Sequence, residues 1–298
     1  MEVNLIIDLH NHTIEGSPDS KLKSSDLFQF ARSIHIDGIG VTEHGSFGSA
    51  SVVQEESKIS GVLAFQGIEY STEFAHLLVY GPSVNLLFPA VDDQIIDTGF
   101  LLNIANSQSQ LSISALKNAI AEIIQPEIPQ TAENILFHGH SKDCCIIFAH
   151  PFSFIGEKLG FNYLLKSWVM EGRGNIHMPA FLKYVSDRNP ELIRIAESSD
   201  AFETINGCAS PVENLLSRLL AIELGKPQTG GSDAHFIEMA GRCVTVFEKN
   251  ISDSKDLVNE IKAGRVSPKE YLNENNILSY YSDYFTYKAK DLRLPQRT

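Results

Sequence analysis

Apolar runs and helical stretches alternate along most of the chain. The run VNLIIDLH at 3–10 predicts a buried strand, and DGIGVTEH at 37–44 predicts a second one. Between them, SSDLFQFARSIH at 24–35 has the spacing of a helix, with Ser24 or Ser25 as its N-cap. Strands that alternate with helices favour a parallel sheet covered by helices, because parallel neighbours need a crossover connection. The pattern therefore predicts an α/β fold.

The later elements continue this alternation. Further helices are expected at 49–60, 111–125, 162–170, 179–187, 212–225 and 251–264, and further strands at 61–71, 74–81, 144–152, 201–207, 227–235 and 241–250. The residues from about 270 onward have no clear period and are expected to form a peripheral strand or tail. We find no repeat or linker, so a single domain over 1–298 is the simplest organisation, within which about 84–142 can be an insertion.

Composition and charge narrow the function classes. Of the 298 residues, 43% are hydrophobic, but no run approaches the roughly 18 apolar residues of a membrane span. The N-terminal run lacks the basic region and cleavage site of a signal peptide, so a cytoplasmic protein is expected. The net charge of −13 argues against nucleic acid held by the general surface. An anionic substrate would need local positive charge, which bound metal ions can supply.

Histidines and acids collect where the predicted strands end. The residues concerned are Asp8, His10 and His12 after the first strand, then Glu43, His44, Glu69, His150, Asp233 and His235, with His76 at the start of its strand. Function gathers at the carboxyl ends of the strands in parallel α/β folds and barrels. Each short motif is weak evidence alone, but their joint occurrence predicts that these side chains form one site.

The residue types in this set favour metal binding. Imidazole nitrogen and carboxylate oxygen suit zinc, manganese and iron. The set contains no cysteine, which disfavours a closed structural zinc site. Eight or nine candidate ligands are too many for one ion, so two or three divalent ions with a bridging carboxylate are expected. Such a site suits attack of metal-activated water on phosphorus.

The order of these motifs resembles one known family. The segments DLHNHT, VTEHG, GIEYS, AHLLVYG, AHP and GGSDAH occur between residue 5 and about residue 247 in the order seen in PHP (polymerase and histidinol phosphatase) metal-dependent phosphoesterases. The resemblance implies a distorted (β/α)7 barrel with a di- or trinuclear metal site at the strand ends. The ligand sets it implies are His10, His12, Glu69 and Asp233 for a first metal, His44 and His235 for a second, and Glu69, His76 and His150 for a third.

Two positions depart from the family pattern. The usual TDH motif is TEH here, and Glu43 is expected to act as a hydrogen-bond partner more than as a metal ligand. The first motif usually continues as HTxxSDG, or places another histidine there, and its acid completes the second metal; this chain has Ser17 at that place. Asp19 or Glu15 can fill the position instead, so both two and three ions stay open.

We therefore expect an enzyme that hydrolyses a small phosphomonoester, such as a nucleotide, histidinol phosphate or sugar phosphate. Either His44 or His235 would transfer a proton to the leaving oxygen. An amide or ester hydrolase on the same metals, or a non-catalytic metal-binding regulatory module, are the alternatives. An exonuclease is less favoured because the sequence has no evident basic groove. The sequence carries no signal for an oligomeric state.

Other polar residues are expected to have supporting roles. Asp8 would orient an imidazole from behind. Glu203 has no metal partner that the sequence identifies, so a core or rim role is expected. Arg242 is a candidate for contact with a substrate phosphate, and Arg173 for a surface role. The remaining histidines, expected to be structural or superficial, are His35, His138, His140 and His177.

Overall fold

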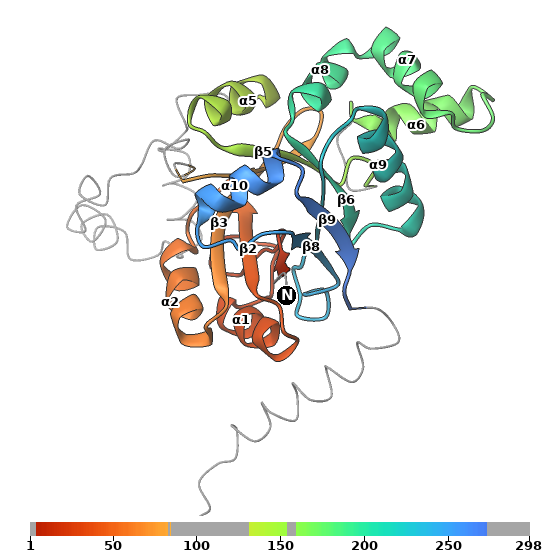
Figure 1. Cartoon of the computed structure of the whole chain (residues 1–298). Coiled ribbons are helices and arrows are strands. Elements are labelled where there is room, and N and C mark those ends of the chain that lie inside the picture. Colours follow the sequence, from red (N-terminus) through yellow and green to blue (C-terminus); the bar gives the residue numbers. More distant parts are fainter. Residues whose placement is uncertain (1–3, 83, 85–130, 154–158, 273–298) are drawn as a thin grey trace, which may run out of the picture.

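The computed structural model describes residues 4–82, 84, 131–153 and 159–272 of the chain. Nine strands lie within these ranges: β1 Leu5–Asp8, β2 Gly38–His44, β3 Leu63–Ser71, β4 His76–Tyr80, β5 Cys145–Ala149, β6 Ala201–Asn206, β7 Gln228–Gly231, β8 Cys243–Phe247 and β9 Val266–Glu270. The described helices are α1 Ser24–Ser33, α2 Ala50–Ser60, α5 Ala132–Ser141, α6 Phe161–Met170, α7 Met178–Arg188, α8 Pro190–Ser198, α9 Pro211–Glu223 and α10 Ser254–Lys262. Figure 1 shows these helices packed around the outside of the strands.

The strands form one sheet in the order β7-β6-β5-β4-β3-β2-β1-β8-β9. Neighbours within β1–β3 and within β5–β7 are parallel, as the alternating pattern predicts. The strand β4 runs antiparallel to both of its neighbours, and β8 runs antiparallel to β1 and to β9, so the sheet is mixed where the pattern predicts a parallel one. Only residues 72–75 join it to β3, and this connection is too short for a crossover.

The two sides of the sheet approach each other and nearly close a barrel. At the carboxyl end, Asn11 and Ala234 form a parallel bridge between the continuations of β1 and β7. Within β7 itself, β8 lies alongside, and the Thr245 hydroxyl accepts from Gly230 N at 2.9 Å and donates to Gly230 O at 2.8 Å. The predicted distorted α/β barrel is therefore confirmed, although the described strands do not divide into seven regular β/α units.

A buried tyrosine fills the barrel interior below its carboxyl end. The Tyr80 side chain is fully buried, and its hydroxyl donates to Leu9 O at 2.5 Å. A Cβ at Gly40 or at Gly67 would collide with the Tyr80 ring or its hydroxyl, so the absence of side chains on β2 and β3 makes room for it. This packing fixes the backbone of residue 9, directly before the first candidate ligand.

Several local expectations are changed by the structure. The α1 N-cap is Lys23, not Ser24 or Ser25, and the Ser24 N–H donates to the Glu15 carboxylate at 3.2 Å instead. The helix α5 was not predicted; its N-terminus is capped by Thr131. The predicted helix at 111–125, most of the expected insertion and nearly all of the expected tail lie outside the described residues. None of the described helices has the length and apolarity needed to span a bilayer.

Candidate metal centre

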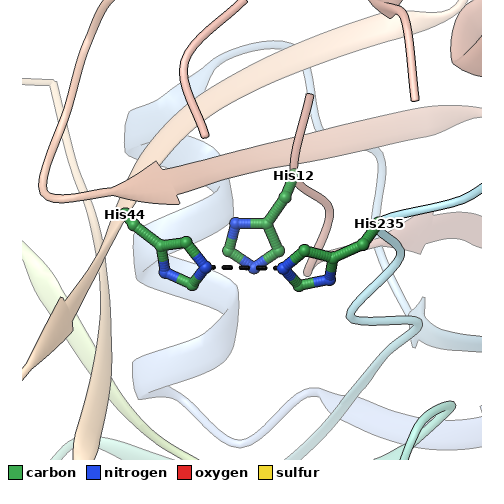
Figure 2. Close-up of side chains that lie close together, drawn as sticks. All are labelled: His12, His44 and His235. Carbon is green, nitrogen blue, oxygen red and sulfur yellow. Dashed lines mark hydrogen bonds between the residues drawn. The ribbon is translucent and has the colours of Figure 1, made fainter. Parts of the chain in front are cut away.

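The predicted site residues come together at the carboxyl end of the barrel. His10 and His12 follow β1, His44 ends β2, and Glu69 lies near the end of β3. The other members are His76 at the start of the antiparallel β4, His150 after β5, and Asp233 and His235 after β7. Figure 2 shows the rings of His12, His44 and His235 pointing toward a common point from three different segments.

Glu69 lies at the centre of this cluster and is almost completely buried. Its Oε1 is 2.8 Å from His76 Nδ1 and 3.2 Å from His150 Nε2. Its Oε2 lies 3.0 Å from His44 Nδ1 and 3.2 Å from His12 Nε2, yet it makes no well-directed hydrogen bond with any residue that the structure describes. The two oxygens of one carboxylate thus face two separate groups of imidazoles, which is the geometry of a bridging ligand.

Ring nitrogens also face one another across the site. His10 Nε2 and His12 Nε2 are 3.1 Å apart, and His44 Nε2 and His235 Nε2 are 3.4 Å apart. Three sets of the described residues hold potential ligand atoms within 4.8 Å of one another: His12, His44 and His235; His10, Glu69 and His150; and His10, His12 and Asp233. Converging imidazoles with an under-bonded buried carboxylate fit divalent transition ions, whose preferred ligands are these groups.

The buried carboxylates of the cluster favour positive charge on the groups around them. Burial by itself would lower the pKa of His12, but the Asp233 and Glu69 carboxylates raise it to about 9. Burial would likewise raise the pKa of the Asp233 carboxyl, but the neighbouring His10 and His12 hold it far below its usual range. The carboxylates therefore stabilise cations among these rings, whether the cation is a proton or a metal ion.

The structure distinguishes the three acids, Glu15, Asp19 and Glu43, that were candidates to join His44 and His235 at the second metal. Asp19 Oδ2 lies 3.3 Å from His44 Nε2 and 3.4 Å from His235 Nε2, on the more exposed side of the cluster. The Glu15 carboxylate instead accepts from the first turn of α1. Glu43 accepts hydrogen bonds from residues 13 and 17, as its expected supporting role requires. Of the three, Asp19 alone reaches the histidines.

Glu203 has a role that sequence reasoning missed. Its Oε1 accepts from His10 Nδ1 at 3.0 Å, and its Oε2 accepts from His150 N at 3.2 Å and Asn206 Nδ2 at 2.9 Å. This contact holds the His10 ring so that Nε2 faces the site. The available signal was an acid inside an otherwise largely apolar strand, as Glu69 is in β3.

Asp8 differs from its expected role. Within the described part of the chain, no hydrogen bond or ion pair joins it to an imidazole ring; its carboxylate accepts the backbone N–H groups of Ser232 at 2.9 Å, Gly241 at 3.2 Å and His10 at 3.3 Å. Burial raises the pKa of Asp8 to about 6, against the effect of these hydrogen bonds. Asp8 therefore fixes the backbone where the first strand meets the segment after β7.

Replacing Glu203 with glutamine tests its control of His10. The amide can present only one oxygen, so either His10 Nδ1 or the His150 N–H must face an NH₂ donor. We expect zinc or manganese affinity to fall by about 10- to 100-fold, as is typical when the partner of a ligating histidine is lost. Titration calorimetry measures this affinity, and the exposed Glu223→Gln on α9 is the matched control. Unchanged affinity in Glu203→Gln would contradict the assignment.

The other singled-out residues lie outside the three ligand sets. Arg173 packs over the Tyr184 ring and pairs with Glu171 on the surface, as expected. Arg242 Nε donates to Glu238 O. His140 pairs with Asp200. Within the described ranges, His35, His138, His140 and His177 take no part in a metal-ligating group.

The fold and the cluster together define a class, the α/β barrels with a histidine–carboxylate site at the strand ends. The model of a protein family described as PHP-associated matches residues 211–266, from α9 to the start of β9, and confirms the resemblance to the PHP family. No curated protein sequence gives a significant match.

Solved structures share the fold at low sequence identity. PsfC from Pseudomonas syringae has a TM-score of 0.52 and 15% identity, with 97% of this chain and 99% of that chain covered. The lesion-specific endonuclease PfuEndoQ from Pyrococcus furiosus has a TM-score of 0.50 and 16% identity, with 88% of this chain and 56% of that chain covered. A Bifidobacterium adolescentis protein assigned as a metal-dependent phosphoesterase has a TM-score of 0.46 and 14% identity, with 88% and 96% covered. The likeness to PsfC and PfuEndoQ shows the fold alone.

Proposed function

We propose that this protein is a metal-dependent phosphoesterase that hydrolyses small phosphomonoesters. The observation that carries the proposal is the position of Glu69, whose two oxygens face two groups of imidazoles at 2.8–3.2 Å. A carboxylate so placed can bridge two cations, and paired divalent cations suit displacement at phosphorus. The PHP-associated match at residues 211–266 supports the same class of chemistry.

The chain offers ligands for two or three ions of zinc, manganese or iron. The proposed groups are His10, His12, Glu69 and Asp233; His44, His235 and Asp19; and Glu69, His76 and His150. When bound, divalent ions at such a site polarise phosphoryl oxygens and lower the pKa of water so that it can attack at neutral pH. The chain has a net charge of −13, so ions bound at this site would supply the positive charge that holds a phosphate.

His44 and His235 are the candidates for proton transfer to the leaving oxygen. They are the more exposed histidines of the cluster, with 29% and 21% of their side chains accessible. His235 Nδ1 lies 3.1 Å from Asp233 O, which leaves Nε2 as the ring atom that faces the site. Because that atom cannot hold a cation and carry a proton at once, only the histidine of the pair that does not bind the ion can act as the proton donor. Asp19 Oδ2 lies close to both Nε2 atoms and can orient either ring.

Phosphate release measured before and after metal removal tests the proposed function. We expect hydrolysis of p-nitrophenyl phosphate to disappear on chelation and to return with manganese. His150→Ala should abolish most of this activity, whereas the exposed His177→Ala should leave it intact. A protein that binds metals but hydrolyses only p-nitrophenyl acetate would be an amide or ester hydrolase. One that binds metals and hydrolyses neither substrate would support a regulatory module.

The substrate screen should include nucleic acid alongside nucleotides and phosphorylated metabolites. PfuEndoQ, whose fold this chain shares, is a lesion-specific endonuclease. The net charge of −13 favours a small substrate over a polyanion, because phosphate backbones are held by clustered lysine and arginine. Cleavage of an oligonucleotide faster than of any monoester would reverse this preference.

A further inference from the structure

The positions where this chain departs from the PHP pattern are in contact with one another. The Ser17 hydroxyl donates to Glu43 Oε2 at 2.5 Å, and both side chains are fully buried. We propose that Ser17 and Glu43 form a positioning relay that fixes the His12 ring with Nε2 directed into the site. This inference rests on the metal site of the proposed function, and it concerns residues beyond the ligands themselves.

The hydrogen bonds of Ser17 and Glu43 determine which groups in the relay donate and which accept. Glu43 accepts from Thr13 N at 3.0 Å, from Thr13 Oγ1 at 2.5 Å and from Ser17 Oγ. A serine hydroxyl has one proton, and this proton is committed to Glu43. The Ser17 oxygen therefore acts as an acceptor toward its other two neighbours, His44 N at 3.1 Å and His12 Nδ1 at 3.3 Å.

This polarity selects one tautomer of His12. Because Ser17 must accept, His12 Nδ1 must carry a proton, and the lone pair of a neutral ring then lies on Nε2. That atom is the one that faces Glu69 Oε2 at 3.2 Å and Asp233 Oδ1 at 3.4 Å. Glu203 imposes the same tautomer on His10, so two separate carboxylates, one direct and one through a serine, orient the paired histidines.

The same relay explains why an acid is absent at position 17. A carboxylate there would lie against Glu43, where like charges repel in a fully buried place. An aspartate at position 43 would be one methylene too short for this contact. Gly16 belongs to the arrangement as well, because a Cβ there would come within 2.6 Å of Glu43 Cδ. The acid is instead supplied by Asp19, which reaches His44 and His235.

Backbone contacts hold the loop in the shape that this arrangement needs. Ser17 N donates to Thr13 O at 2.8 Å and Ser20 N donates to Ser17 O at 3.1 Å, so residues 13–20 form consecutive turns. Lys21 N donates to His235 O at 2.9 Å, which anchors the far end of the loop beside the site. Ser17 is thereby presented to His12 by a constrained backbone.

The test compares Ser17→Ala, Glu43→Asp and Asp19→Asn in the full-length, zinc-loaded protein. Nitrogen NMR of labelled histidine reports which ring atom is protonated and which binds zinc. We expect His12 to bind zinc through Nε2 with a slowly exchanging Nδ1–H in the unmodified protein and in Asp19→Asn. In Ser17→Ala and Glu43→Asp the Nδ1–H should exchange with solvent faster, and a second His12 signal from unliganded rings should appear. Zinc affinity by calorimetry should fall about 10- to 100-fold in each relay variant.

Two measurements test the Ser17–Glu43 relay independently of whether the protein hydrolyses phosphoesters. The double variant Ser17→Ala/Glu43→Asp should bind zinc no more weakly than the worse single variant, because both changes break one chain of contacts. Additive losses, or an unchanged His12 signal in folded Ser17→Ala, would overturn the relay. Circular dichroism establishes that each variant is folded. If the ring state responds as expected but no phosphoester is hydrolysed, the proposed function fails and the relay stands.

Discussion

Glu69→Gln is expected to reduce phosphate release by at least about 10³-fold, equivalent to roughly 4 kcal/mol of transition-state stabilisation. The amide keeps one acceptor oxygen and replaces the other with an NH₂ group. Whichever way it turns, it presents N–H donors either to His76 and His150 or to His12 and His44. The bridge between the two ligand groups is therefore lost although the side-chain volume is conserved.

Metal content and steady-state kinetics should be measured together for this variant. We expect about one fewer ion per chain by elemental analysis, with the loss appearing in kcat and not only in KM. The exposed Glu55→Gln on α2 is the matched control and should behave like the unmodified protein. If Glu69→Gln kept both its metal content and its activity, the central carboxylate would be structural and the bridging assignment would be wrong.

The elements that carry the site were predictable because their signals are local. The apolar runs before His10, His44 and His150 mark buried strands, and a strand in a parallel sheet ends at the edge where its neighbours end. The antiparallel direction of β4 was not predicted, because periodicity does not encode strand direction. Its direction follows from the length of the connection at 72–75, and it places His76 at the same rim although it begins its strand.

The hydrogen bonds and ion pairs that orient the ligand residues were harder to predict from the sequence. Glu203 meets His10 only because β6 and the end of β1 approach each other across the interior of the barrel, 193 positions apart in sequence. The choice among Glu15, Glu43 and Asp19 likewise depends on how one loop folds. Neither the distance across a barrel nor the path of a loop is encoded in a hydrophobic pattern. The motifs identify which histidines and acids form the site. The fold determines which ring nitrogen or carboxylate oxygen each of them directs into it.

Metal loading is expected to raise the melting temperature on the order of 10 °C. A ligand that binds only the folded state at about 1,000 times its Kd contributes roughly 4 kcal/mol. For a chain of this size each kcal/mol corresponds to about 2–4 °C. The ligand atoms come from segments as distant as His12 and His235, so the unfolded chain does not hold them together, and binding energy becomes folding energy.

Thermal unfolding followed by circular dichroism, with chelated protein and with added zinc or manganese, measures this shift. Magnesium is the control ion, because it prefers oxygen ligands and should raise the melting temperature much less at a site rich in imidazole. His177→Ala should retain the whole shift, and Glu69→Gln should lose a large part of it because one ligand group is disconnected. An equal shift with magnesium, or the same zinc shift in Glu69→Gln, would mean that ions stabilise the protein elsewhere. Absence of any shift with zinc and manganese would mean that the converging imidazoles do not bind these ions in solution.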